Sequence, residues 1–222
     1  MARYDHFVFD AYGTLLDVHS AAARLSGEIG AAWERLSQTW RTKQLEYTWV
    51  HALAGRPATF WELTERSLDY AIAVSGGVAP GVRERLLAAY RELAPYPEVA
   101  RVLAALRSRG ARLAILSNGD PDMLRAAVRA AGLEGALDDV ISVREAGIFK
   151  PSMSVYRLAS ERLSAEPAAI SFQSSNRWDI AGAKAFGMRT VWVNRGGLPD
   201  EYPAMPADLV VRDLAALESG GD

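Results

Sequence analysis

Residues 6–17 read HFVFDAYGTLLD, and this stretch decides the fold. The short apolar run from His6 to Phe9 is typical of a buried strand, and it leads directly into Asp10 and the Gly13-Thr14 turn. Asp10 is therefore predicted to stand at the carboxyl end of a strand. In open α/β sheets that end of the strands is where ligands bind, so Asp10 is a candidate functional residue.

The next stretch, roughly Ser20 to Arg91, has the residue spacing of helices. Its apolar side chains recur every three or four positions, first at Trp33, Leu36 and Trp40 and then at Leu45, Trp49 and Leu53. We therefore predict a block of helices here. Its large aromatic residues are expected to pack this block, with only some of them lining a pocket; they are Trp33, Trp40, Trp49, Phe60 and Trp61.

After Pro95-Tyr96-Pro97, short apolar runs alternate with helical segments, a pattern typical of a parallel α/β sheet. The predicted strands are Leu113–Leu116, Ile170–Phe172 and Thr190–Val193, and the predicted helices are Asp120–Ala131 and Arg177–Gly187. The helical block separates the first strand from the others. The pattern thus predicts a doubly wound, Rossmann-like α/β core formed by residues 1–16 and 96–222, with a helical cap inserted at 17–95.

The bulk composition indicates an ordinary globular protein. Half of its 222 residues are hydrophobic, 23% are charged and the formal net charge is -2, so there is no electrostatic pull toward nucleic acid and a small-molecule partner is expected. Cysteine is absent, which excludes disulfides, thiolate metal sites and cysteine nucleophiles. No signal peptide and no apolar run of about 20 residues can be recognised. We expect a soluble cytoplasmic protein without a membrane partner.

Three polar clusters fall at the carboxyl ends of predicted strands and should meet in one crevice. They are Asp10 to Thr14, Ser117-Asn118-Gly119, and Ser174-Ser175-Asn176 with Asp179. Lys150 lies just before a predicted helix for which Ser152 is a plausible cap, and it could reach the same crevice. A carboxylate attacks as a nucleophile only when it is ionised and held in place, and a nearby ammonium favours both conditions.

Each of these features also has a purely structural interpretation. Asp10 could form an Asx turn and have no further role. Residues 117–119 could be an ordinary turn before the Asp120-Pro121 helix start, and Lys150 could be a surface lysine. The histidines His6, His19 and His51 lack the spacing of metal ligands and are assigned no chemistry. No cofactor and no metal site are predicted.

Taken in order, the motifs DAYGTLLD, WRTKQLEYTW, SNG, FKP and SSNRWD resemble those of the L-2-haloacid dehalogenases of the haloacid dehalogenase superfamily. The resemblance covers nearly the whole chain. It implies that Asp10 displaces halide from a short L-2-haloacid with inversion, forming an ester that water opens to a D-2-hydroxyacid. It also implies a homodimer whose partners are the 2-haloacid and the halide, and no metal.

The resemblance also assigns roles to individual residues. Thr14 and Lys150 hold Asp10, Tyr156 supports the charged network, and Ser117 with neighbouring amides receives the substrate carboxylate. Arg41 and Asn118 face the departing halide. Ser174, Asn176 and Asp179 position and activate water, with Asp179 as general base, and the apolar wall consists of Tyr12, Leu45, Phe60 and Trp178.

One position bears on the preferred substrate, and two others bear on the choice between a dehalogenase and its rivals. Thr42 stands where many relatives carry glutamine, which affects pocket width and substrate length. A superfamily phosphatase would need a second aspartate where this chain has Tyr12, and it would usually need an acidic metal ligand where this chain has Ser175. A catalytically silent binding protein on the same fold is a further alternative, although unneeded ionisable groups around one cavity would be costly.

Overall fold

The computed structural model describes residues 4–218, and their centre is a six-stranded parallel sheet in the order β3-β2-β1-β4-β5-β6. The strands are β1 His6–Phe9, β2 Arg112–Ser117, β3 Asp139–Ser142, β4 Ile170–Ser174, β5 Arg189–Val193 and β6 Leu209–Val211. The predicted doubly wound α/β core is confirmed. The sequence analysis did not identify β3 and β6, because these edge strands are short and only partly buried, so their apolar pattern is weak.

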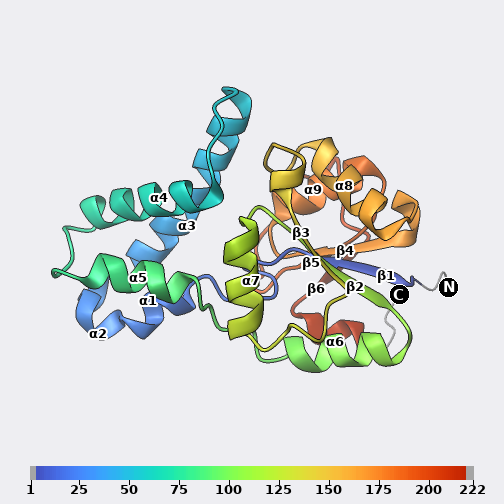
Figure 1. Cartoon of the computed structure of the whole chain (residues 1–222), viewed down its shortest axis with the longest axis horizontal. Coiled ribbons are helices and arrows are strands. Elements are labelled where there is room, and N and C mark those ends of the chain that lie inside the picture. Colours follow the sequence, from blue (N-terminus) through green and yellow to red (C-terminus); the bar gives the residue numbers. More distant parts are fainter. Residues whose placement is uncertain (1–3, 219–222) are drawn as a thin grey trace.

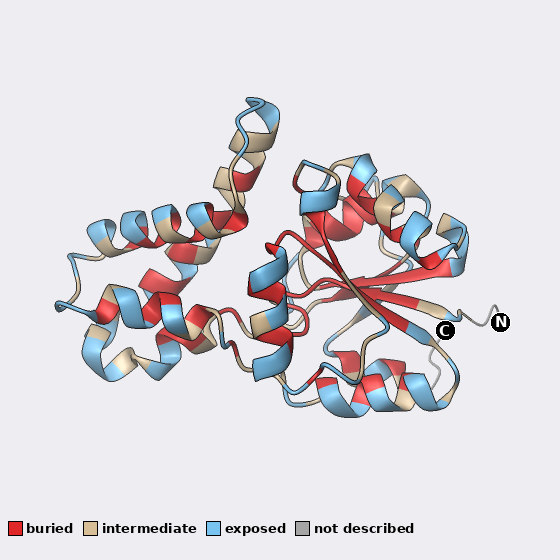
Figure 2. Cartoon of the chain, in the orientation of Figure 1, coloured by how far each residue is buried: buried red, intermediate tan, exposed pale blue. Residues whose placement is uncertain are grey.

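Helices cover both faces of the sheet, with α8 and α9 on one side and α6 on the other (Figure 1). The helices of this part of the chain are α6 Val99–Ser108, α7 Pro121–Ala130, α8 Met153–Leu163 and α9 Arg177–Phe186. Figure 2 shows that the strands are buried while the outer faces of these helices are exposed. Short 3-10 helices occupy Gly30–Ala32, Val143–Glu145, Pro167–Ala169 and Leu214–Leu217.

The predicted helical block lies to one side of the sheet, between β1 and β2 in the chain (Figure 1). It consists of α1 Ser20–Arg24, α2 Ser26–Ile29, α3 Trp33–Leu53, α4 Phe60–Val74 and α5 Val82–Tyr90. The two segments that connect it to the core lie side by side and are hydrogen-bonded to each other. Asp17 N donates to Ala94 O (2.8 Å), and Tyr96 N donates to Leu15 O (3.0 Å). This pairing supports the proposed boundaries after residues 16 and 95.

The aromatic residues of the helical block do more than pack it. Trp40 is buried and donates its indole N–H to Thr64 O (2.9 Å), as expected of a packing residue. Phe60, however, contacts Tyr12 of the core with a ring-centroid distance of 5.6 Å, and Trp49 meets Trp178 edge to face at 5.5 Å. These contacts join the helical block to the core.

Two core helices begin at the predicted residues, and neither N-cap side chain bonds a backbone N–H of its helix. Asp120 precedes α7 with Pro121 at its first turn, as predicted. Ser152 precedes α8, but the expected side-chain cap is wrong: its hydroxyl contacts Ser154 Oγ (3.0 Å), and its backbone carbonyl accepts from Val155 N (3.0 Å).

The histidines occupy structural positions. His6 lies in β1, His19 Nδ1 bonds Ser37 Oγ (2.8 Å), and His51 Nδ1 bonds Arg56 O (2.9 Å). Among residues 4–218, no helix has the length and apolar character needed to cross a membrane.

Gly182 of α9 provides a test of how closely α9 packs against Tyr156 of α8 and against Pro151. A Cβ added there would overlap the Tyr156 hydroxyl and lie 2.8 Å from Pro151 Cβ. Gly182→Ala should therefore lower the free energy of unfolding by about 1–3 kcal/mol in urea titrations, the usual cost of overpacking. Gly27 of α2 is the matched control, since a Cβ there meets nothing within 4 Å. An equal loss in Gly27→Ala would contradict this account.

Candidate active site

Asp10 follows β1, the strand at the middle of the sheet, and is flanked by the ends of β2 and β4. The register pairs Phe9 with Ile115 on one side and with Gln173 on the other. The residues that come next, toward Ser117 and Ser174, therefore lie beside Asp10. The three polar clusters meet at one edge of the sheet because parallel strands bring their carboxyl ends together.

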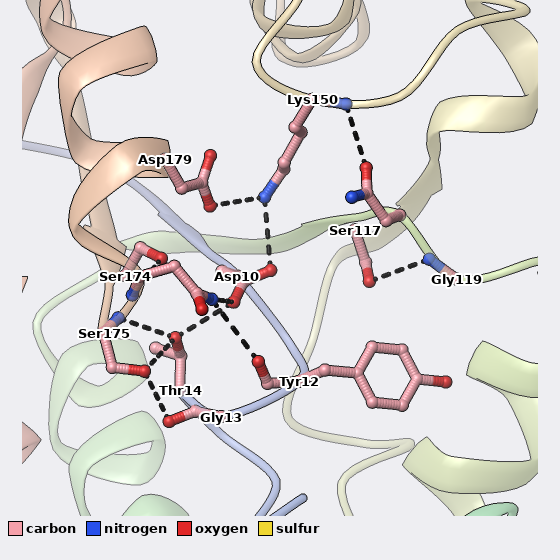
Figure 3. Close-up of polar contacts among 12 residues, drawn as sticks. Asp10, Tyr12, Gly13, Thr14, Ser117, Gly119, Lys150, Ser174, Ser175 and Asp179 are labelled. Atoms are coloured by element: carbon pink, nitrogen blue, oxygen red, sulfur yellow. Dashed lines mark hydrogen bonds and ion pairs between the residues drawn. The ribbon is translucent and has the colours of Figure 1, made fainter. Parts of the chain in front are cut away.

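Both oxygens of the Asp10 carboxylate accept hydrogen bonds from side chains (Figure 3). Oδ2 accepts from Thr14 Oγ1 (3.1 Å) and from Asn176 Nδ2 (2.8 Å), while Oδ1 lies 3.2 Å from Lys150 Nζ. These partners are not the backbone N–H groups of an Asx turn. The carboxylate is buried at 5% exposure, and these three partners hold it in one direction.

Lys150 is buried at 1% exposure, so its interpretation as a surface lysine is wrong. Its ammonium lies between two carboxylates, 3.2 Å from Asp10 Oδ1 and 2.8 Å from Asp179 Oδ2. Its backbone N–H donates to Asn118 Oδ1 (3.0 Å), and its Nζ lies 5.0 Å from the centre of the Phe172 ring. One ammonium therefore forms ion pairs with both buried carboxylates.

Asp179 stands behind Asp10, with no exposed surface of its own. Burial raises the pKa of its carboxyl, whereas the Lys150 ammonium acts in the opposite direction. Tyr156 donates its hydroxyl to Asp179 Oδ1 (2.8 Å). Burial also raises the pKa of the Tyr156 phenol well above its ordinary value, so that group remains a proton donor to the carboxylate.

Ser175 fixes the turn that carries Asp10, a role that the sequence analysis did not assign to it. Its backbone N–H donates to Thr14 Oγ1 (2.9 Å) and its hydroxyl donates to Gly13 O (2.5 Å). Gly13 adopts φ +94°, a backbone conformation that residues other than glycine rarely adopt. The turn after β1 is thereby tied to the end of β4, and Thr14 Oγ1 is placed to donate to Asp10.

A small pocket of about 10 Å³ lies in front of Asp10, with room for roughly one water molecule. Its wall comes from the core and from the helical block, and it consists of Asp10, Tyr12, Arg41, Leu45, Phe60, Ser117, Asn118, Asn176 and Trp178. Every residue that the family resemblance assigned to the substrate pocket lies here. Their roles toward a substrate stay predictions.

Arg41 brings a cation into this cavity from helix α3. Its Nη2 donates to Tyr12 O (2.8 Å) and to Asn176 Oδ1 (3.2 Å), both in the core, and its Nη1 donates to Gln44 Oε1 (3.0 Å). Gln44 is a second residue that the sequence analysis missed. The available signal was its position four residues after Trp40 and eight after Leu36, which places it on the buried face of the helix.

The remaining predicted polar residues are engaged locally. Ser117 Oγ accepts from Gly119 N (3.1 Å), so this segment is also an ordinary turn. Ser174 Oγ accepts from Asn176 N (3.1 Å) at the start of α9. Tyr12 stacks on Tyr90 with 5.7 Å between ring centres, and burial raises the pKa of its phenol well above the ordinary value. Tyr12 therefore adds a neutral aromatic wall to the cavity.

Comparison with known proteins agrees with this geometry. The profile of haloacid dehalogenase-like hydrolases matches residues 4–187, which is most of the chain. The chain belongs to this family. It is 49% identical over 211 residues to (S)-2-haloacid dehalogenase 1 from Pseudomonas sp. (strain CBS-3), covering 95% of this chain and 93% of that protein.

Two crystal structures share the whole fold of this family member. A dehalogenase with an intermediate complex is 44% identical, with a TM-score of 0.94 and coverage of 96% of this chain and 95% of that one. The L-2-haloacid dehalogenase from Xanthobacter autotrophicus with chloropropionic acid covalently bound is 37% identical, with a TM-score of 0.85 and coverage of 98% of both chains.

The shared cation predicts a pH-dependent stability defect in Lys150→Met. Without the ammonium, Asp10 and Asp179 are two buried carboxylates with no balancing charge between them, and the free energy of unfolding near neutral pH should fall by about 3–5 kcal/mol. The folded variant then binds a proton more tightly than the unfolded chain does. Its stability should therefore rise as the pH falls from neutral toward the ordinary carboxyl range.

Urea unfolding at about pH 8 and about pH 5 measures this effect. The matched control is the double variant Lys150→Met/Asp179→Asn, which removes one carboxylate together with the cation. It should recover part of the lost stability and show a flatter pH dependence. A single variant as stable as the wild type at both pH values would refute the shared-cation interpretation.

Proposed function

We propose that this protein is an (S)-2-haloacid dehalogenase that hydrolyses short L-2-haloacids to D-2-hydroxyacids and halide. The observation that carries this proposal is the Asp10 carboxylate, held 3.2 Å from the Lys150 ammonium at the base of a pocket that also contains the Arg41 guanidinium. A fixed anion is a nucleophile, and a cation in the same cavity can stabilise a departing anion.

In the first step, an Asp10 oxygen attacks substrate carbon C2 from the side opposite the halogen. The new C–O bond forms as the C–X bond breaks, and the halide leaves with the bonding electron pair. Arg41 and Asn118 receive the halide, while Ser117 and neighbouring backbone amides hold the substrate carboxylate. Halide needs no proton to leave, so this step requires no general acid.

In the second step, water attacks the carboxyl carbon of the Asp10 ester. Asp179 accepts a proton from this water, and Ser174 and Asn176 position it. The bond between that carbon and the product oxygen breaks, the hydroxyacid takes up a proton, and the Asp10 carboxylate is restored. The inverted C2 is not touched again, so an L substrate yields a D product. The covalently bound chloropropionic acid of the Xanthobacter relative supports this route.

A phosphatase of the same family is the main rival, and two side chains argue against it. Tyr12 replaces the aspartate that would protonate a leaving alcohol, and its ring stacks on Tyr90 and contacts Phe60 at a tilt. Ser175 replaces the acidic metal ligand, and its hydroxyl is used by Gly13 and Thr14. Phosphate chemistry would therefore lack both proton donation and charge neutralisation from these positions.

We also infer that two copies of the chain associate, as the family resemblance implies, and that the protein acts in the cytoplasm, as its sequence features predict. A small 2-haloacid is the partner that the pocket residues suit, because they combine the Arg41 cation with the apolar side chains of Leu45, Phe60 and Trp178.

The proposed function is tested by halide release from L-2-chloropropionate with a chelator present, beside a phosphate-release assay with magnesium. We expect chelator-resistant halide release and a D-2-hydroxyacid product. A single turnover in heavy-oxygen water should give product carrying the original light oxygen of Asp10. Solvent label in that first product, retained configuration, or magnesium-dependent phosphate release without dehalogenation would overturn the proposal.

Asp10→Asn should leave a folded protein without measurable halide release, because the neutral amide cannot displace the halide. Activity by halide electrode and folding by thermal unfolding are measured on the same sample. Intact mass excludes deamidation back to aspartate. Substantial turnover by a sample that still contains asparagine would rule out attack by Asp10.

Substitutions at Arg41 and Asp179 should affect different steps of the reaction. Arg41→Ala should slow single-turnover halide release by about 10²- to 10³-fold, the size expected for losing an electrostatic donor to the developing charge. Asp179→Asn should release up to one equivalent of halide and accumulate the ester, which intact mass detects after rapid quench. An Asp179→Asn protein that turns over repeatedly without accumulating ester would remove Asp179 from the second step.

A further inference from the structure

Gln44 is a fully buried polar residue on α3 for which the two-step mechanism has no use. Both ends of its carboxamide are paired. Oε1 accepts from Arg41 Nη1 (3.0 Å) and from the Tyr90 hydroxyl (3.0 Å), and Nε2 donates to Thr64 Oγ1 (2.7 Å). Gln44 thus connects the cavity arginine to helices α4 and α5.

The direction of these hydrogen bonds is determined by their chemistry. A guanidinium can only donate, so the Gln44 oxygen must face Arg41. Thr64 Oγ1 donates its own proton to Phe60 O (2.7 Å), so it is available as the acceptor for the Gln44 amide. A rotated amide would direct its N–H groups at the Arg41 N–H and its oxygen at the Thr64 oxygen. Thr64 therefore selects the amide orientation that accepts from Arg41.

Arg41 needs such an anchor, because its long side chain crosses from the helical block to the core. Nη2 is held on the core side by Tyr12 O and Asn176 Oδ1, and Nη1 is held on the helical side by Gln44. Two anchors on different nitrogens fix the plane of the guanidinium. Because Gln44 is neutral, it orients the Arg41 guanidinium without neutralising its charge. A carboxylate in its place would orient the guanidinium and also neutralise it.

We propose that Gln44, oriented by Thr64, is a positioning residue that directs the Arg41 guanidinium at the departing halide. This inference rests on the proposed dehalogenation and extends it to a residue beyond the cavity wall. It implies that the carboxamide acts on C–X cleavage alone. Opening of the Asp10 ester uses Asp179 as the base, and its carboxylate is bonded to Lys150 and Tyr156. Asn176 also contacts Arg41, but it has its own bonds to Asp10 and to Ser174 that do not involve Gln44.

Single-turnover rapid quench with L-2-chloropropionate and L-2-bromopropionate separates halide release from ester hydrolysis. Gln44→Met retains bulk but removes the acceptor, and it should slow chloride release by about 10- to 100-fold, as expected for a lost hydrogen bond to a charged group. Bromide release should slow less, because a better leaving group needs less stabilisation. The rate of ester hydrolysis should stay at the wild-type value, and the loss should fall on kcat more than on KM.

Three companion variants separate orientation, charge and general destabilisation. Gln44→Glu keeps an acceptor for Arg41 but neutralises it, and it should also slow halide release. Thr64→Val removes the oxygen that orients the amide and should slow halide release as Gln44→Met does. Thr64→Ser keeps that oxygen and should release halide at the wild-type rate. Thr48→Val is the matched control, since Thr48 is equally buried and its hydroxyl donates to Leu45 O (2.6 Å) within α3.

The possible outcomes distinguish this inference from the proposed function. A wild-type protein that releases no halide overturns the proposed function itself. An active wild type in which Thr64→Val equals Thr64→Ser, or in which Gln44→Met slows chloride and bromide release equally, overturns the role of Gln44 alone. Should Gln44→Met fail to fold, the Thr64 pair decides the question by the same leaving-group comparison.

Discussion

The interaction on which the site depends is the contact of one buried ammonium, Lys150, with two buried carboxylates, Asp10 and Asp179. Carboxylates lose the solvation of water when they are buried, and an isolated one would take up a proton rather than remain charged. The shared cation lies within ion-pair distance of both carboxylates, and all three side chains are buried. The Tyr156 hydroxyl and the amide of Asn176 satisfy further carboxylate oxygens, so the cluster is held by hydrogen bonds as well as by charge.

The rest of the fold positions this cluster and closes the space in front of it. The parallel sheet supplies the acid at the end of its central strand, and α9 begins beside it with Asn176. The helical block supplies Arg41, the second cation, on the opposite side of the cavity. The catalytic side chains thus come from two layers of the structure, and the aromatic contacts between Trp49 and Trp178 join those layers.

Much of this arrangement could be predicted from the sequence, because it depends on local patterns. The apolar runs identified β1, β2, β4 and β5, and the turn residues after them identified the polar clusters. Parallel pairing then required that those clusters converge. The edge strand β6 escaped detection, since a strand of three residues with one exposed face has no distinctive pattern. Ser152 is the N-cap residue of α8, but its hydroxyl contacts Ser154 Oγ and accepts no backbone N–H of the first turn.

The sequence by itself determined the fold class, the position of Asp10 at a strand end and, through resemblance, the set of residues around it. Only the tertiary structure decided which polar side chains are buried together. Lys150 before a proline could equally have been exposed, and Gln44 reads as any polar helix residue, because burial and charge pairing arise between segments far apart in the chain. Spacing along one segment reports the face of a helix or strand, but the electrostatic environment of a side chain depends on its neighbours from other segments.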